Sequence, residues 1–562
     1  MARFVRASKY RHVFGHLGKK EYSIDNVKVT GSAWDTNMIA ASGSYLSINW
    51  NSSGGGAFAI LPLASPFAPL PHHLPSKLPD VIPLARGHTA PVLDTVWNPF
   101  DDSVVASGGE DGKVLIWKVE ESQFDAWGGD KWVPVDFDPV ARVDASPRKI
   151  GQVLFHPTAA HVLASASGEH TVKLWDLNNT DNPKSTLVGH GDTIQSLAFN
   201  TTGNLLVTTC RDRKLRLFDP RTGGVPVRVG EGHGGIKGAR VTWMGERDKI
   251  ATTGFSRMSE RQVGIWETGS LANERTLNVD QSAGVVMPFW SDNNILFLGA
   301  DGNIRYYEYE GDQLYALDEH KSSDPQRGLC FLPRRALNVS ECEIARAYKV
   351  AGNTIEPIAF VVPRRADSFQ SDIFPPAPSS EPALSAREFF EGKVAPPNLV
   401  NLENGTITTS TSPLPSIPLP SIPPSTRTLS TPLPEPAQVP IPPTPMTKRT
   451  ETFPLPSPSP AQPSPSLHSF TPVPSPLPAS VPDLKPEPVP AQKVEVDVSM
   501  AIPSPPYFVV DWNWMQTKLQ EENAKLNAEL REARAMIRTL ELQVEAMRAN
   551  AQRAAKALLE QH

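Results

Sequence analysis

A unit of alternating apolar residues, interrupted by Gly and Pro at fixed places, recurs through the first part of this chain of 562 residues. Its clearest copy opens at Gly87-His88, passes through two apolar stretches and a glycine-rich turn at 108–112, and closes at Ile116-Trp117. Apolar alternation with a period of two, punctuated in this way, predicts short antiparallel strands. One copy therefore predicts one small sheet, and its repetition predicts a series of such sheets.

The copies also share their internal spacing. Asp111 lies six positions before the closing Trp117, and Ser107 lies ten positions before it. Further copies with an acid six positions before the closing aromatic residue end at Trp175, Phe218, Trp266 and Tyr307. Gly-His openings, Trp closings and a spacing near 40 residues are typical of WD repeats. The strand sets predict an all-β seven-bladed propeller, with blades near 30–80, 84–119, 134–177, 185–219, 228–267, 272–311 and 320–363. The segment 10–14 is expected to pair with the last blade and so close the ring.

The polar residues of the unit admit two interpretations. His88, Ser107 and Asp111 have the side chains of a base, a nucleophile and an acid, as a hydrolase would need. The set recurs in every clear copy, whereas an active site is assembled once, so we predict a buried hydrogen-bonded row and no catalysis. The residues expected to stabilise the blades are His88, Ser107, Asp111, Trp117, Ser165, Trp175, His190, Asp212, His233 and Trp266.

No metal or cofactor is predicted. Cys210, Cys330 and Cys342 follow no metal-ligand spacing, and the glycines at 54–56 lack the Lys-Ser/Thr that completes a phosphate loop. The formal net charge of -6 does not suggest nucleic-acid binding. We also find no apolar run of membrane-spanning length and no apolar core of a signal peptide, which predicts a cytosolic protein.

Composition changes sharply after the repeats. The chain has 57 prolines, far above the average share, and most of the excess lies in the second half. We predict a propeller at 1–365, an extension packed on it at 366–405, a disordered Pro/Ser-rich linker at 406–507 and a coiled coil at 508–562. The extension is separated from the linker by its aromatic residues, such as Phe374 and Phe389. The linker is either a spacer or a docking segment for Pro-motif-binding domains, through sequences such as 415–418.

The carboxyl-terminal segment has a heptad pattern. With Leu519 as position d, apolar residues hold most a and d positions over several heptads, which favours self-association over a single docked helix. Asn523, Ile537 and Val544 at position a favour a parallel dimer. The residues expected at the oligomer interface are Leu519, Asn523, Leu526, Leu530, Ile537, Leu540, Val544, Met547 and Leu558.

The segments that flank the repeats resemble those of coronins, a family of actin-binding propeller proteins. The matching segments are 4–15, 53–63, 342–349, 355–365, 371–376 and 382–393, so the resemblance covers about 1–405. Generic WD-repeat proteins lack these flanking motifs. Coronins often carry an Arg-led trimer motif in the coil, and here Met536 stands where the Arg is expected, so dimer and trimer both stay open.

The resemblance implies a cytoplasmic, cytoskeletal protein at actin patches or cortical actin, which binds actin filaments and regulates the actin-related-protein branching complex. Residues that make the amino-terminal region basic, and so suit an acidic filament, are Lys9, Arg11, Lys19, Lys20 and Lys28. Lys28 stands where many coronins have a filament-contacting Arg, and an ordinary solvated charge is the alternative. A coiled coil that joins propellers would let weak contacts add and crosslink filaments. The competing hypothesis is a general WD-repeat scaffold that recruits signalling proteins through its propeller and Pro-rich region.

Overall fold

The computed structural model describes residues 6–409, except 33–35, 55, 72–73, 125–126, 128–131 and 366–367. The chain divides into two compact units, Met1–Ser430 and Thr431–His562, and all described residues belong to the first unit. The predicted linker beyond 409 lies outside the described residues. The same holds for the predicted coiled coil at 508–562, with its interface residues from Leu519 to Leu558.

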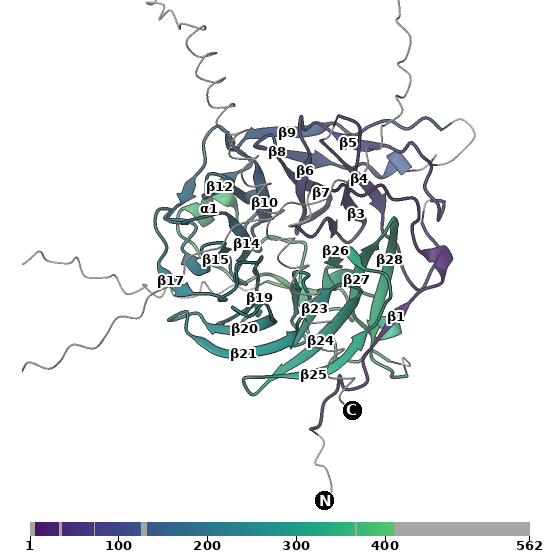
Figure 1. Ribbon diagram of the computed structural model, residues 1–562. Helices are drawn as coiled ribbons and strands as arrows, with labels where there is room; N and C mark the ends of the chain where they lie inside the picture. The colour runs from purple at the N-terminus through teal and green to yellow at the C-terminus, as the bar shows by residue number, and fades with distance from the viewer. Residues whose placement is uncertain are drawn as a thin grey trace, which may run out of the picture. The chain divides into compact units, whose positions relative to one another are not determined.

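Seven four-stranded antiparallel sheets surround a common centre as the blades of a propeller (Figure 1). Blades 1 and 2 contain β2 (Ile39–Ala41), β3 (Tyr45–Asn49), β4 (Ala57–Pro62) and β5 (Leu84–Arg86), then β6 (Val92–Asn98), β7 (Asp101–Gly109), β8 (Lys113–Lys118) and β9 (Pro139–Asp144). Blades 3 and 4 contain β10 (Ile150–Phe155), β11 (Val162–Ser167), β12 (Val172–Asp176) and β13 (Ser185–Leu187), then β14 (Ile194–Phe199), β15 (Leu206–Cys210), β16 (Lys214–Phe218) and β17 (Arg228–Glu231). The prediction of a seven-bladed all-β propeller is confirmed.

The remaining blades follow the same plan. Blades 5 and 6 contain β18 (Arg240–Trp243), β19 (Lys249–Phe255), β20 (Arg261–Glu267) and β21 (Asn273–Asp280), then β22 (Met287–Ser291), β23 (Ile295–Ala300), β24 (Asn303–Glu310) and β25 (Gln313–His320). Blade 7 contains β26 (Gln326–Phe331), β27 (Glu343–Ala351), β28 (Thr354–Val361) and β1 (Phe14–Leu17). Short 3-10 turns occur at η1 (Lys20–Tyr22), η2 (Glu121–Phe124), η3 (Arg334–Ala336) and η4 (Val339–Glu341).

The predicted limits of most blades are wrong by one strand. The predicted second blade begins at 84, but β5 (Leu84–Arg86) pairs with β4 and is the outer strand of blade 1. Likewise β9, β13, β17 and β21 each complete the blade before the one to which the sequence pattern assigned them. The closing Trp ends the third strand of a blade, and the sequence pattern alone does not show that the next strand folds back onto it.

The amino terminus closes the ring, as predicted, although with a later strand. β1 pairs antiparallel with β28, and Phe14 lies opposite Val361 (Figure 1). The predicted strand at 10–14 is therefore misplaced, because the strand that pairs with blade 7 begins at Phe14 and continues to Leu17. Tyr10 and Val13 instead form a turn, with the Val13 N–H donating to the Tyr10 carbonyl at 3.1 Å, and both side chains are buried. Because the turn anchors these apolar residues in the core, the chain becomes extended only from Phe14.

The apolar core lies mainly between neighbouring blades. The Trp117 ring on blade 2 meets Phe58 on blade 1 edge-to-face, with ring centroids 5.3 Å apart. Trp175 on blade 3 packs in one cluster with Ala106 and Ile116 on blade 2. Burial of each large side chain stabilises the fold by roughly 1.5–3 kcal/mol, so the closing aromatic residues join one sheet to the next.

Residues 368–408 continue from blade 7 and contact the ring at two places. They contain β29 (Ala377–Pro378), α1 (Ala386–Phe390), β30 (Leu399–Val400) and β31 (Ile407–Thr408), and the three strands form one small sheet. Ile373 and Phe374 are buried beside the turn formed by residues 10–13. Phe389 of α1 is buried against blade 3, and the Leu384 N–H donates to the Thr158 carbonyl at 3.0 Å. Ser385 and Glu388 form a capping box at the start of α1.

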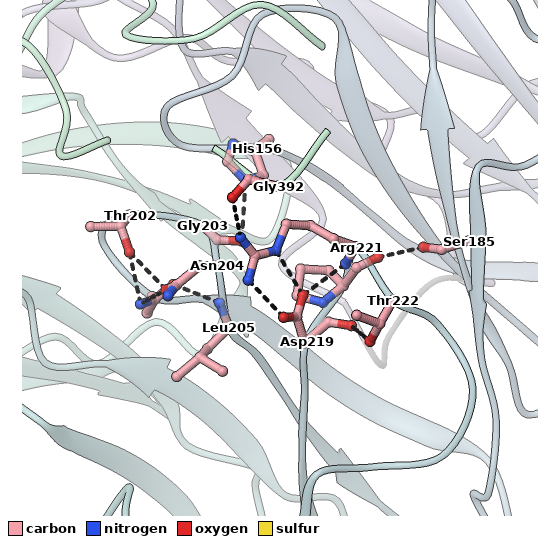
Figure 2. Close-up of polar contacts among 12 residues, drawn as sticks. His156, Ser185, Thr202, Gly203, Asn204, Leu205, Asp219, Arg221, Thr222 and Gly392 are labelled. Atoms are coloured by element: carbon pink, nitrogen blue, oxygen red, sulfur yellow. Dashed lines mark hydrogen bonds and ion pairs between the residues drawn. The ribbon is translucent and has the colours of Figure 1, made fainter. Parts of the chain in front are cut away.

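A polar network joins α1 to blades 3 and 4. Arg221 makes a bidentate pair with Asp219 and donates to the Gly392 carbonyl at 3.0 Å (Figure 2). His156 donates from Nε2 to the Gly203 carbonyl at 3.1 Å, and its ring lies 4.2 Å from the Phe389 ring by centroids. Burial lowers the pKa of His156 to about 3, although the Gly203 carbonyl opposes this shift, so His156 is neutral.

Candidate functional site

Blade 2 contains a continuous hydrogen-bonded row of four side chains. Trp117 Nε1 donates to Ser107 Oγ at 2.8 Å, and Ser107 Oγ is 2.8 Å from His88 Nε2. His88 Nδ1 is 2.9 Å from Asp111 Oδ1, and both of these side chains are almost completely buried. Asp111 also accepts the N–H groups of Thr89 at 2.9 Å and Lys113 at 3.1 Å. Each polar atom of the row therefore has a partner inside the sheet.

This geometry uses the hydrogen-bonding capacity of the row within the blade itself. Burial opposes ionisation of Asp111, but the hydrogen bond from His88 and the two backbone N–H groups outweigh it, so the pKa of Asp111 is lowered. His88 Nε2 accepts from Ser107, and Ser107 Oγ also accepts from Trp117 Nε1, so the buried serine hydroxyl has both of its partners inside the sheet. The arrangement fixes the turn at 110–112 to the loop that contains His88.

The other blades keep only part of the row, which corrects the expectation that the full set recurs. In blade 4, His190 Nε2 is 2.9 Å from Thr208 Oγ1, but His190 Nδ1 donates to the His170 carbonyl at 3.0 Å. Asp212 instead accepts a bidentate pair from Arg216, which stands four residues later. Burial opposes ionisation of Asp212, but the Arg216 guanidinium holds the pKa of that carboxyl well below its usual range.

Blades 3 and 5 depart from the pattern at the acid. In blade 3, Trp175 donates to Ser165 at 2.9 Å, and Glu169 accepts from Ser146, which occupies the place of the missing Gly-His. In blade 5, His233 Nε2 is 2.8 Å from Thr252 Oγ1, and Trp266 Nε1 donates to the same oxygen at 2.6 Å. Glu260 accepts from Ser256 Oγ at 3.3 Å, without reaching His233. The absence of a Gly-His before blade 3 is the one sequence signal that could have revealed its departure.

Lys28 lies in the amino-terminal segment that precedes β2, and its side chain contacts Asp80 in the connection between β4 and β5 of blade 1. Its side chain is 42% exposed, and Nζ donates to the Asp80 carbonyl at 2.9 Å and lies 3.8 Å from the Asp80 carboxylate. Asn26 has a left-handed φ of 65° and donates to the Leu78 carbonyl at 2.7 Å. Thr354 on blade 7 donates to Asp25 at 2.7 Å. The segment that carries Lys28 is therefore fixed to both blade 1 and blade 7.

The other four basic residues predicted for the site contact different elements. Lys9 donates to the Asp372 carbonyl in the extension. Lys19 pairs with Glu21 at 3.6 Å, where both side chains are largely exposed. Lys20 is exposed in η1 and Arg11 is half-buried, and neither forms an ion pair in the part of the chain that the structure describes. The region is basic, but its charges are spread from the extension to blade 1.

A cavity of about 530 Å³ lies at the centre of the ring. It is lined by residues from the inner strand of every blade, among them Ala40, Asp94, Gln152, Ser196, Arg240, Phe289 and Phe331. Asp94 Oδ2 accepts the Val153 N–H at 3.0 Å. Burial raises the pKa of Asp94 to about 7, although the Val153 N–H and the Arg240 charge act in the opposite direction. Sequence reasoning missed this residue, since a lone Asp in a strand gives no sign that it faces the centre.

Family models match the chain along the ring. A model described as a type of WD40 repeat matches residues 355–397, and the WD domain, G-beta repeat model matches 81–118, 138–176 and 181–219. A domain of unknown function, DUF1899, matches residues 3–67. The closed ring of seven sheets and the polar row of blade 2 define a WD-repeat β-propeller. Among the described residues, no helix is long and apolar enough to cross a membrane.

Similar proteins narrow the class to one family. The chain is 49% identical over 411 residues to the coronin-like protein crn1 of Schizosaccharomyces pombe, covering 71% of this chain and 65% of that protein. It is 41% identical over 413 residues to coronin-A of Dictyostelium discoideum, covering 72% and 88%, and 38% identical over 423 residues to human coronin-2A, covering 73% and 77%. The crystal structure of the WD40 domain of Toxoplasma gondii coronin matches with a TM-score of 0.62 at 27% identity, over 69% of this chain and 97% of that one.

The chain therefore belongs to the coronin family, and the resemblance of the flanking motifs is confirmed. It spans less than two thirds of the length of its two yeast relatives, 65% of the S. pombe protein and 61% of the coronin-like protein of Saccharomyces cerevisiae.

Proposed function

We propose that this chain is a non-enzymatic, coronin-type actin-associated protein whose propeller binds the sides of actin filaments in the cytoplasm and cytoskeleton. The observation that carries the proposal is the identity of 38–49% to coronins over more than 400 residues, which includes the ring and its extension. A closed propeller is a rigid platform, and rigidity lowers the entropic cost of binding a regular polymer.

Lys28 is the residue that we propose for direct filament contact. Its ammonium is partly exposed, and its carboxylate neighbour Asp80 is 87% exposed, so their ion pair is weak and can exchange for an acidic group on a partner. The backbone around Lys28 is anchored to two blades, which presents the charge at a fixed place. Lys9, Arg11, Lys19 and Lys20 add to the positive potential of this region and would raise the association rate.

We further propose that a coiled coil at 508–562 joins several propellers, as a dimer or trimer. Weak contacts of single propellers would then add through effective concentration and crosslink filaments. By family resemblance, the same segment engages the actin-related-protein branching complex. The heptad pattern around Leu519 supports self-association. Sequences such as 415–418 in the Pro-rich segment offer a further contact for Pro-motif-binding domains.

Cosedimentation with actin filaments tests the Lys28 contact. Full-length Lys28→Glu is expected to bind at least fivefold more weakly than wild type, which corresponds to about 1 kcal/mol. Lys28→Arg should bind at least as well as wild type, because the guanidinium keeps the charge and adds bidentate geometry. The matched control is Lys118→Glu at the end of β8, an exposed lysine without an ion pair among the described residues. Equal binding of Lys28→Glu and Lys118→Glu would remove Lys28 from the contact.

Deletion of 508–562 tests the role of the coil. The shortened chain should lose filament bundling, measured by low-speed sedimentation, and keep weak filament binding. If filament binding and bundling are both unchanged, the avidity mechanism is wrong and a scaffold function is favoured.

A further inference from the structure

Blade 5 presents two neighbouring aliphatic side chains to solvent. Met258 is 83% exposed and Ile236 is 80% exposed, and they are the two most exposed large hydrophobic residues in the described part of the chain. Ile236 lies in the loop before β18, and Met258 lies in the turn between β19 and β20. These two residues, contributed by separate segments of one blade, form a small apolar surface open to solvent.

The two segments lie directly against each other. The Gly235 N–H donates to the Phe255 carbonyl at 2.8 Å, and a Cβ on Gly234 would approach Arg257 Cγ to 2.9 Å. The Ser259 N–H donates to the Ser256 carbonyl at 3.0 Å, so Arg257 and Met258 occupy the two corners of this turn. Ser256 Oγ accepts the N–H groups of Met258 and Glu260, each at 3.1 Å. The turn is therefore held in a fixed shape with its corner residues directed outwards.

Cations surround the two aliphatic side chains. Lys237 follows Ile236 in the sequence, and Arg257 precedes Met258. Arg213 lies on the adjacent turn of blade 4, and its backbone carbonyl accepts the Gly232 N–H at 2.7 Å. All three are exposed, and within the described residues none of them forms an ion pair. We call Arg213, Ile236, Lys237, Arg257 and Met258 the blade-5 patch.

The acids near the patch do not neutralise it. Asp192 pairs with Arg211 at 4.0 Å, and Glu231 pairs with Lys214 at 3.8 Å. Arg211 and Lys214 are two further cations beside the patch. Asp212 is held by Arg216, and half-buried Glu260 accepts from Ser256. The surface keeps an excess of positive charge, which favours an anionic partner.

The two turn corners of the patch, Arg257 and Met258, are not needed to hold the blade together, whereas Lys237 Nζ also lies 4.7 Å from the centroid of the buried Phe255 ring. In blade 2 the corresponding turn carries Asp111, which binds His88. In blade 5 that turn carries Arg257 and Met258, and His233 is held through Thr252 without a carboxylate. Substitutions at these corner positions can therefore report on binding without disturbing the blade.

We propose that the blade-5 patch binds the surface of an anionic lipid bilayer, with Ile236 and Met258 in the interfacial region and Arg213, Lys237 and Arg257 at the headgroup phosphates. Projecting aliphatic tips flanked by cations suit a soft, planar, negatively charged surface. A small anion would need a pocket here, and the crevice beneath the patch, lined in part by Arg213 and Lys237, has only about 10 Å³ of room. That is about enough for one water molecule.

Vesicle cosedimentation with the full-length protein tests the proposal. Wild type is expected to sediment with phosphatidylcholine vesicles that contain phosphatidylserine, to release as salt is raised, and to remain in the supernatant with phosphatidylcholine alone. The double substitution Lys237→Ser and Arg257→Ser should weaken binding about twenty-five-fold, since each cation near an anionic surface contributes about fivefold. Ile236→Ser with Met258→Ser should also weaken binding, while the remaining binding keeps its salt dependence.

The matched controls are Val133→Ser with Val135→Ser, two valines that are 73% and 71% exposed on another part of the ring, and Lys118→Glu. These controls should bind vesicles as wild type does. Absence of wild-type binding to the phosphatidylserine vesicles would overturn the proposal, and so would equal binding by patch and control variants. Patch variants that bind vesicles normally but lose actin filaments would instead make this surface a filament contact.

Discussion

Gly203→Ala tests whether His156 supports the contact between the ring and α1. Gly203 has a left-handed φ of +73°, and a Cβ placed there would lie 1.9 Å from His156 Nε2. His156 is completely buried, and its Nδ1 accepts the N–H groups of Thr158 at 3.2 Å and Ala159 at 2.8 Å. Its ring also packs on Phe389 of α1 (Figure 2 shows His156 beside Gly203). An alanine at 203 therefore has to displace the imidazole.

The expected cost can be built from two contributions. The left-handed backbone costs an alanine about 1–2 kcal/mol. Displacement of His156 leaves the buried N–H groups of Thr158 and Ala159 without their acceptor, at about 1–3 kcal/mol each. Gly203→Ala should thus lower the free energy of unfolding by about 3 kcal/mol or more.

Gly224→Ala is the matched control. Gly224 has a similar φ of +77°, but no atom lies within 4 Å of the position that its Cβ would occupy. This variant should lose only the backbone contribution of about 1–2 kcal/mol. Urea denaturation followed by tryptophan fluorescence measures both, and limited proteolysis near α1 reports release of the extension. Equal denaturation midpoints for the two variants, with α1 equally protected, would refute the role given to His156.

Three further predictions concern the buried polar groups. Burial lowers the pKa of His156 to about 3 and that of His190 to about 4, and the Arg216 charge also lowers the pKa of His190. Both histidines are therefore neutral in the folded state. Their contribution to the free energy of unfolding is complete above pH ~6.5 and falls by about 2 kcal/mol each by pH ~5, because the unfolded state then binds protons that the folded state does not. In Asp94→Asn, which removes the opposing titration of Asp94 between pH 7 and pH 5, urea midpoints that do not fall over this range would contradict the prediction. Ser107→Ala leaves Trp117 Nε1 and His88 Nε2 unpaired and should lower the free energy of unfolding by about 2–4 kcal/mol. Ser165→Ala leaves only Trp175 Nε1 unpaired and should lower it by about 1–2 kcal/mol. Equal losses for the two variants in urea denaturation would show that the hydrogen bond to His88 contributes nothing. The pKa of Asp94 is raised to about 7, so its carboxylate destabilises the fold as pH rises above ~4; Asp94→Asn should be more stable than wild type by about 1–2 kcal/mol at pH 8 and indistinguishable at pH 4, and a less stable variant at pH 8 would refute the assignment.

The propeller could be predicted because its determinants are local in the sequence. The turn acid, the serine and the closing Trp of blade 2 lie within eleven consecutive residues, 107–117, and their spacing reappears in later copies. The strand count follows from apolar alternation, which directly reflects burial of one or both faces. What failed was the assignment of the outer strands, because β5 and β9 pair with the blade before them through contacts that the alternation does not encode.

Contacts between distant segments could not be predicted from the pattern. His156 meets Phe389, and Tyr306 donates to the Val13 carbonyl at 2.9 Å, although each pair is far apart in the chain. The blade-5 patch was missed for a related reason. Ile236 and Met258 fit apolar positions in a sequence pattern equally well whether they are buried or exposed, and only the fold shows that they project into solvent.

The hydrogen-bond partners of the turn acids also could not be predicted from the spacing of residues in the sequence. Asp212 matches the turn acid of a WD repeat, yet Arg216 competes for its carboxylate and His190 turns to a backbone carbonyl. Spacing identifies which groups can meet, whereas the distances and charges in the folded sheet decide which pair forms. The hydrogen bond from the closing Trp to Ser or Thr was therefore predicted correctly in blades 2, 3 and 5. The bond between the turn acid and His was predicted correctly in blade 2, but it does not form in blades 4 and 5.

The saturation of actin filaments by the full-length wild-type chain is the most direct measurement of the function proposed here. Increasing filament concentrations should sediment the protein along a saturable curve, and the half-saturation concentration should rise with ionic strength, because the proposed contacts are made by exposed cations. A chain that stays in the supernatant at every filament concentration, while its circular dichroism shows a folded propeller, would contradict the proposed function.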